Sequence, residues 1–140
     1  SGVSEVLELD SNIDISDDIL AFIFSNIQTS YDLFYTLYYL TDLKEDVDGN
    51  KTVIEFQTFM LKRIISLIED NGDNYHNNSK EVKLFLDEIV PLADDLLAGY
   101  SSFLSFLDYE TDQFKERTEY YLKSFEKNLD ELLNNNSNTE

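Results

Sequence analysis

Glycine and proline are scarce in this chain, which has four glycines and one proline among its 140 residues. Tight turns between short strands depend on these two residue types, so an architecture of many short β-strands is disfavoured. Apolar residues instead recur at steps of three and four along most of the sequence, which is the period of an amphipathic α-helix. We therefore expect an all-α protein made of a few long helices.

Four amphipathic patterns follow one another, and the connections between them are short or polar. Their expected ranges are 14–40, 52–70, 79–107 and 108–134. Such an order predicts an antiparallel four-helix bundle. The polar step at Thr29 and the helix-disrupting Pro91 are points where long helices can break, which would give five or six helices.

The chain length fits one domain with its own core. We expect a flexible N-terminal segment over residues 1–13, a single helical-bundle domain over 14–134 and a disordered tail over 135–140. The tail reads NNSNTE and has no apolar side chain to bury.

The charge balance is strongly acidic, because 29 Asp and Glu residues against 10 Lys and Arg residues leave a formal net charge of −19. Binding to a phosphate backbone needs clustered Lys and Arg, so direct binding of nucleic acid is disfavoured. We expect the partner to be another protein with a basic surface. A second interpretation is that the acidity only keeps a chain rich in tyrosine and phenylalanine in solution.

Several classes of chemistry find no support in the sequence. The chain has no cysteine, which excludes disulfides and thiol nucleophiles, and its single histidine, His76, lies in a polar segment far from a catalytic pattern. No apolar run is long enough to span a membrane, and we expect no membrane insertion. We also expect neither an enzyme nor a cofactor. The sequence leaves the localisation open, including whether a signal or anchor precedes Ser1.

The stretch DVDGNKTVIEF, residues 46–56, resembles the first half of an EF-hand calcium loop. A degenerate calcium site would use Asp46, Asp48, Asn50 and Thr52. However, Lys51 occupies the position that needs glycine for a sharp turn, and Gln57 the position that needs a bidentate glutamate. We therefore interpret the stretch as a joint between helices, in which Asp48 or Asn50 caps the second helix.

The stretch YDLFYTLYYL, residues 31–40, carries apolar or aromatic side chains around nearly its whole helical circumference. Such a helix is either central in its bundle or exposes an aromatic strip. Tyrosine suits a protein interface because its ring buries apolar area while its hydroxyl keeps a hydrogen bond. We expect the partner-binding surface to consist of Tyr31, Asp32, Tyr35, Tyr38, Tyr39, Asp42 and Glu45.

These features together predict a non-enzymatic acidic bundle that acts through protein–protein binding, as an inhibitor, an immunity protein or an adaptor does. Three other functions stay open: a nucleic-acid mimic whose carboxylates imitate phosphates, a Bcl-2-like modulator with a groove for an amphipathic helix, and the degenerate calcium binder. An enzyme or ligand carrier with a pocket inside the bundle is a further class. The sequence does not specify the oligomeric state or the partner.

Overall fold

The computed structural model of the chain describes residues 17–70 and 80–138, and every regular element in these two ranges is helical. The elements are α2 (Asp17–Tyr35), the π-helical η1 (Thr36–Leu40), α3 (Val47–Asp70), α4 (Lys80–Tyr109) and α5 (Asp112–Asn138). The predicted all-α class is confirmed.

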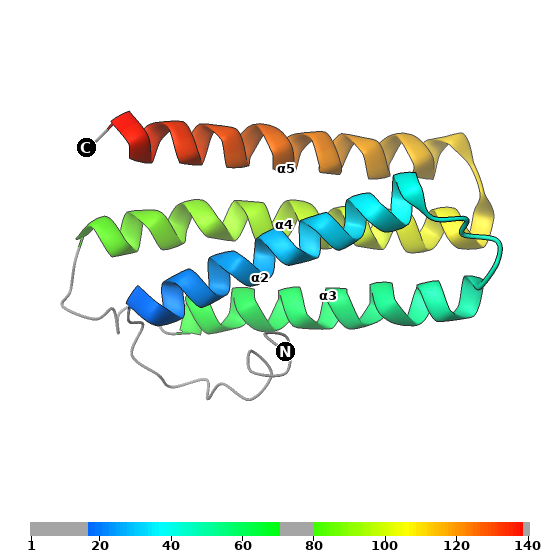
Figure 1. Cartoon of the computed structure of the whole chain (residues 1–140), viewed down its shortest axis with the longest axis horizontal. Helices are drawn as coiled ribbons and strands as arrows, with labels where there is room; N and C mark the ends of the chain where they lie inside the picture. The colour runs from blue at the N-terminus through cyan, green and yellow to red at the C-terminus, as the bar shows by residue number, and fades with distance from the viewer. Residues whose placement is uncertain (1–16, 71–79, 139–140) are drawn as a thin grey trace.

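The four long helices pack against each other, and consecutive helices run in opposite directions (Figure 1). The central helix is α4, with α3 on one side and α5 on the other. Across this layer of three runs α2, obliquely, starting beside the C-terminal half of α3 and ending toward α5 (Figure 1). The predicted antiparallel four-helix arrangement is therefore confirmed, with α2 crossing the other three.

The helix breaks that we predicted are wrong. Helix α2 continues through Thr29, whose hydroxyl donates a hydrogen bond to the carbonyl oxygen of Ser25 at 2.9 Å, so its polar side chain is satisfied within the helix. Helix α4 continues through the exposed Pro91. A proline removes one helical donor, and the helix continues across that single loss.

The first helical pattern departs from α-helical geometry at η1, later along the chain than the predicted break at Thr29. There the helix widens to a π-helical turn and ends at Thr41, whose backbone is extended and whose hydroxyl donates to the carbonyl oxygen of Thr36 at 2.9 Å. Single π-helical turns of this kind are rare and often occur at functional sites.

Two helix boundaries also differ clearly from the predicted ones. Helix α3 begins at Val47, earlier than residue 52, and α5 continues through Asn138 into the segment expected to be a disordered tail. Between α4 and α5 the chain reverses at Glu110, whose φ of 49° is left-handed and whose amide donates to the carbonyl oxygen of Phe106 at 2.7 Å. The expected flexible segment 1–13 and residue 79, where the third helix was predicted to begin, lie outside the described residues.

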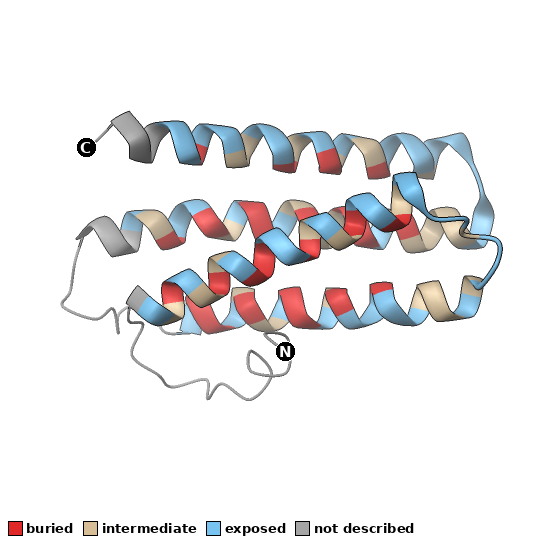
Figure 2. Ribbon diagram, in the orientation of Figure 1, coloured by how far each residue is buried: buried red, intermediate tan, exposed pale blue. Residues whose placement is uncertain are grey.

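The core is lined by the sides of the four helices that face one another (Figure 2). At its centre the fully buried ring of Phe34, from α2, lies 4.4 Å from the ring of Tyr100 and 5.5 Å from that of Phe103, both in α4. The Tyr100 hydroxyl donates to the carbonyl oxygen of Ser30 at 2.6 Å. The aromatic cluster therefore fixes α2 on α4 through both packing and a buried hydrogen bond.

Gly99 permits this close approach. A Cβ atom at position 99 would lie 2.8 Å from the Cε2 atom of Phe34 and 3.3 Å from the Cβ atom of Tyr121 in α5. Any side chain there would push α2 and α5 away from α4.

We expect Gly99→Ala to destabilise the protein even though alanine is the better helix former. Overpacking a core costs ~1–3 kcal/mol, which equals or exceeds the ~1 kcal/mol gained in helix propensity. Urea unfolding followed by circular dichroism measures the difference. Ser101→Ala, at an exposed position of the same helix, is the control and should leave stability unchanged or slightly higher. A Gly99→Ala protein as stable as Ser101→Ala would contradict the close approach.

Candidate partner-binding surface

Tyrosines follow one another along α2 and η1. Tyr31, Tyr35 and Tyr39 recur at steps of four, and the centroids of successive rings are 6.3 Å and 4.8 Å apart. The ring of Tyr38 meets that of Tyr39 edge-on at 4.8 Å. We call these four residues the tyrosine ladder. Tyr31 and Tyr38 are half-buried, whereas Tyr35 and Tyr39 are 40% and 44% exposed. The ladder therefore lies at the edge of the core, with two of its rings accessible to a partner.

Helix α5 provides the other side of this surface. The Tyr31 ring stacks on Phe125 with centroids 4.8 Å apart, and its hydroxyl donates to Oε2 of Glu126 at 2.5 Å. Glu119 lies seven residues before Glu126, on the same side of α5, and its negative charge acts on Tyr38 and Tyr39. Two glutamates that we did not predict thus form an acidic rim along the ladder.

The surroundings of Tyr31, Tyr38 and Tyr39 favour the protonated form of their hydroxyls. Burial raises the pKa of Tyr31 above its ordinary value, and the hydrogen bond to Glu126 raises it further. Burial and the charge of Glu119 likewise raise the pKa of Tyr38 and of Tyr39. The buried hydroxyl of Tyr38 has no hydrogen-bond partner among the described residues. Tyr31, Tyr38 and Tyr39 therefore hold neutral hydroxyls next to carboxylates.

The predicted acidic residues of the surface have different surroundings. Asp32 is exposed on α2, close enough for its charge to act on Tyr31. The carboxylate of Asp42 accepts a hydrogen bond from the Lys44 amide at 3.1 Å and shapes the turn after η1. Glu45 is exposed in the same connection, and no described contact joins it to the ladder. Only Asp32 therefore joins the two α5 glutamates at the rim.

The calcium-like stretch forms the start of α3. The Oδ1 atom of Asp46 accepts a hydrogen bond from the Gly49 amide at 3.0 Å, so Asp46 is the N-cap of α3. The prediction that Asp48 or Asn50 caps this helix is therefore wrong. A Cβ on Gly49 would overlap Oδ2 of Asp46, so glycine makes room for this cap. The side chain of Lys51 pairs with that of Asp108 at the end of α4.

The remaining residues of the calcium alternative lie within the helix. Asp48, Asn50 and Thr52 are two residues apart on α3 and point in different directions, so they cannot surround one ion. Within the described ranges no group of three or more His, Asp or Glu residues is placed to hold a metal ion. The alternative of an EF-hand-like calcium loop is therefore not supported, whereas the interpretation of the stretch as the start of the second helix agrees with α3.

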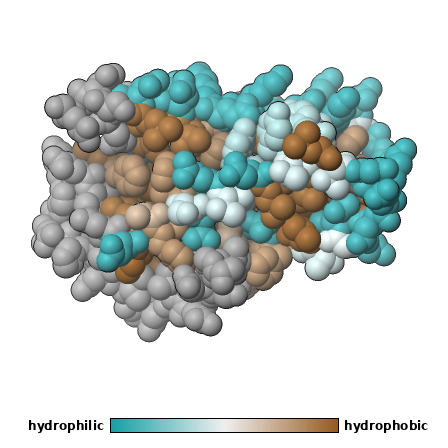
Figure 3. All heavy atoms as spheres, viewed as in Figure 1, coloured by the Kyte–Doolittle hydropathy of each residue, from teal (hydrophilic) through white to brown (hydrophobic). Residues whose placement is uncertain are grey.

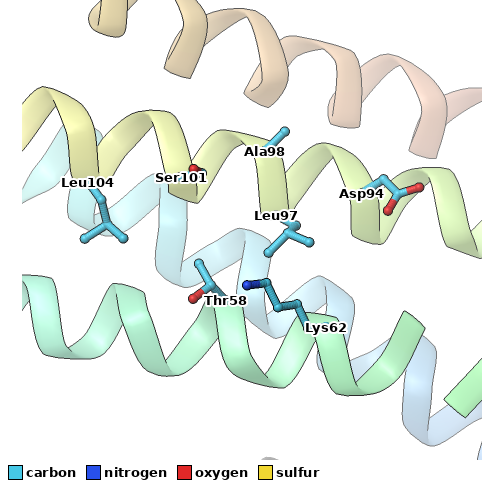
Figure 4. A pocket seen from close by; sticks show the side chains of 7 residues that line it. All are labelled: Thr58, Lys62, Asp94, Leu97, Ala98, Ser101 and Leu104. Carbon is cyan, nitrogen blue, oxygen red and sulfur yellow. The ribbon is translucent and has the colours of Figure 1, made fainter. Parts of the chain in front are cut away.

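A cavity of about 430 Å³ opens between α3 and α4 (Figure 4). Its lining consists of Thr58 and Lys62 from α3 and Asp94, Leu97, Ala98, Ser101 and Leu104 from α4. Figure 4 shows the Lys62 side chain reaching between the two helices, while the Asp94 carboxylate points away from it. The Thr58 hydroxyl donates to the carbonyl oxygen of Glu55 at 2.7 Å, so its proton is engaged within α3.

Replacing the Asp46 cap should lower stability without involving calcium. We expect Asp46→Ala to reduce the free energy of unfolding by ~1 kcal/mol, because the Gly49 amide loses its acceptor, whereas Asp46→Asn keeps the cap and most of the stability. Thermal unfolding with and without millimolar calcium chloride checks both variants. A calcium-dependent stabilisation of the wild type that both variants lose would instead indicate a metal site.

The Tyr31 hydroxyl should make stability depend on pH in the alkaline range. Because its pKa is raised in the folded protein, the folded state holds this proton more tightly than the unfolded chain, whose tyrosines ionise near about pH 10. The stabilisation is complete below about pH 10 and is lost as the pH rises through the folded pKa. The stability difference between wild type and Tyr31→Phe should therefore shrink above about pH 10.

Urea unfolding at neutral and alkaline pH measures this difference. Tyr120→Phe is the matched control, since Tyr120 is 66% exposed, and it should change stability by less than about 0.5 kcal/mol at either pH. A Tyr31→Phe difference that does not vary with pH would refute the assigned bond to Glu126.

Comparison with known proteins assigns nothing further to this surface. No protein-family model, curated protein or solved structure matches the chain. Among the helices that the structure describes, none combines the length and the apolar character of a membrane span.

Proposed function

We propose that this protein acts by binding another protein that carries a basic surface, in the manner of an inhibitor, an immunity protein or an adaptor. The proposal rests mainly on one observation, the exposed rings of Tyr35 and Tyr39, of which Tyr39 lies near the carboxylates of Glu119 and Glu126. We define the contact surface as the tyrosine ladder together with Asp32, Glu119 and Glu126.

The tyrosines and the carboxylates of this surface contribute to binding in different ways. A tyrosine ring has few rotatable bonds, so burying it costs little conformational entropy, and tyrosine is enriched among residues that dominate binding energy. Carboxylates speed the encounter with a basic partner and set its orientation. An arginine of the partner can contact both residue types, because its guanidinium stacks on an aromatic ring and pairs with a carboxylate through two hydrogen bonds. We therefore expect arginines at the centre of the partner's contact surface.

The distribution of charge favours approach of the partner from this side. No Lys, Arg or His precedes Lys44 in the sequence, so α2 and η1 carry acidic charges alone. Along α5 the glutamates alternate with Lys115, Arg117, Lys123 and Lys127. Such alternation differs from the row of carboxylates that imitation of a phosphate backbone requires, which supports protein binding over nucleic-acid mimicry.

Site-specific photo-crosslinking tests the surface. A benzophenone amino acid replaces Tyr35 or Tyr39 in one set of variants, and Tyr109 or Tyr120 in the control set, which are 68% and 66% exposed. After incubation with extract of the native source, we expect one product from the ladder positions that the control positions do not give. Its yield should fall at high salt, because screening weakens the carboxylates.

Affinity measurements with the identified partner complete the test. We expect Tyr39→Ser to weaken binding by roughly tenfold or more, as at an interface hot spot, while Tyr120→Ser changes it by less than about twofold. A captured partner with an acidic contact surface, or crosslinks only from the control positions, would refute the proposal.

A further inference from the structure

The cavity of about 430 Å³ between α3 and α4 opens on the face of the layer opposite to α2. Gly99 of α4 faces α2, because a Cβ atom there would lie close to the ring of Phe34. Ser101, which lines the cavity, follows Gly99 by two residues and so lies about 200° further around the helix. Figure 4 looks onto this face, with α2 passing behind α3 and α4. We call the cavity the α3–α4 cleft.

The cleft is bounded along the two helices. Beyond Leu104, the ion pair between Lys51 and Asp108 joins α3 to α4. Toward the other end, the half-buried side chains of Ile65 and Val90 pack against the core from α3 and α4. The volume falls within the range of ~300–1,000 Å³ that is typical of small-molecule sites. The cleft therefore suits a small molecule better than a docked helix, which needs a longer groove.

Lys62 supplies an unpaired positive charge to the cleft. Its side chain reaches between the two helices (Figure 4), and no described carboxylate lies within ion-pair distance of it. The positions three and four residues away along α3, where a helical partner would stand, hold Thr58, Phe59, Ile65 and Ser66. An ammonium group without a partner, placed at the wall of a cavity, favours an anionic ligand.

The wall formed by α4 is largely apolar, because Leu97, Ala98 and Leu104 line it with half-buried side chains. The Ser101 hydroxyl makes no hydrogen bond to a described residue, so it is free to donate to a ligand oxygen. The carboxylate of Asp94 points away from Lys62 (Figure 4), and its exposure lets solvent screen its charge. An anion next to the ammonium group thus finds a hydroxyl donor and an apolar surface beside it.

We propose that the α3–α4 cleft binds a small amphipathic carboxylate, which is a molecule with one carboxylate group and a short hydrocarbon chain. The carboxylate pairs with the Lys62 ammonium and accepts a hydrogen bond from the Ser101 hydroxyl, while the hydrocarbon chain covers Leu97, Ala98 and Leu104. A single ammonium compensates one negative charge, which favours a monocarboxylate over a doubly charged phosphate. The net charge of −19 repels anions at long range, but at about 0.15 M salt this repulsion is screened beyond about 8 Å.

The site is separate from the candidate partner-binding surface. The face that carries α2 shows apolar areas among hydrophilic residues (Figure 3), and the cleft opens on the other face. The tyrosine ladder lies against Phe125 and Glu126 of α5, whereas the cleft lies between α3 and α4. A ligand in the cleft therefore leaves the ladder accessible, and the outcome of the following experiment is independent of the proposed function.

Nuclear magnetic resonance titration of the full, isotope-labelled chain with sodium octanoate tests the site. We expect saturable shifts of the amides around Lys62 and Ser101, with a dissociation constant on the order of a millimolar because the ligand is small. Octanol and octylamine have the same chain without the negative charge, and they should bind roughly threefold or more weakly. Lys62→Met should weaken octanoate binding by a similar factor and leave octanol binding unchanged.

Three further variants complete the experiment, and circular dichroism first confirms the helical content of each. Ser101→Phe, at an exposed position, fills the cleft and should abolish the binding of both octanoate and octanol. Lys127→Met removes the same charge from an exposed position of α5 and should leave octanoate binding unchanged. Asp94→Asn should bind octanoate as tightly as the wild type or more tightly.

Four outcomes would overturn the proposal. They are the absence of saturable shifts at tens of millimolar octanoate, shifts confined to residues outside the cleft, wild-type affinity of Lys62→Met for octanoate, and binding of octanol or octylamine as tight as that of octanoate.

Discussion

The close approach at Gly99 is the constraint on which the arrangement of the helices depends. Because position 99 has no side chain, the ring of Phe34 can lie against the backbone of α4, and the Tyr100 hydroxyl can reach the carbonyl oxygen of Ser30. These contacts fix one point of α2 on α4. From that point the helix runs obliquely, so its last turns lie toward α5 and away from the N-terminal half of α3 (Figure 1). The position of the tyrosine ladder next to α5 results from this crossing.

The sequence predicts the helices well because their apolar residues repeat with the helical period, and it predicts the breaks badly because local preferences are weak. Pro91 removes one hydrogen bond from a helix that packs on three neighbours, and this packing outweighs the loss. The predicted start of α3 is wrong for a related reason. Gly49 indicates a turn by its propensity, yet within the first helical turn it gives Asp46 space to cap.

The candidate surface could be predicted in part. The YDLFYTLYYL stretch identifies the tyrosines, and their spacing places Tyr31, Tyr35 and Tyr39 in line. The sequence also places Glu119 and Glu126 on one side of α5, seven residues apart beside the buried Leu122 and Phe125. The periodicity of the sequence does not show which helix lies next to the ladder. Which helix lies next to the ladder depends on the crossing of α2, and that follows from packing between residues distant in the sequence.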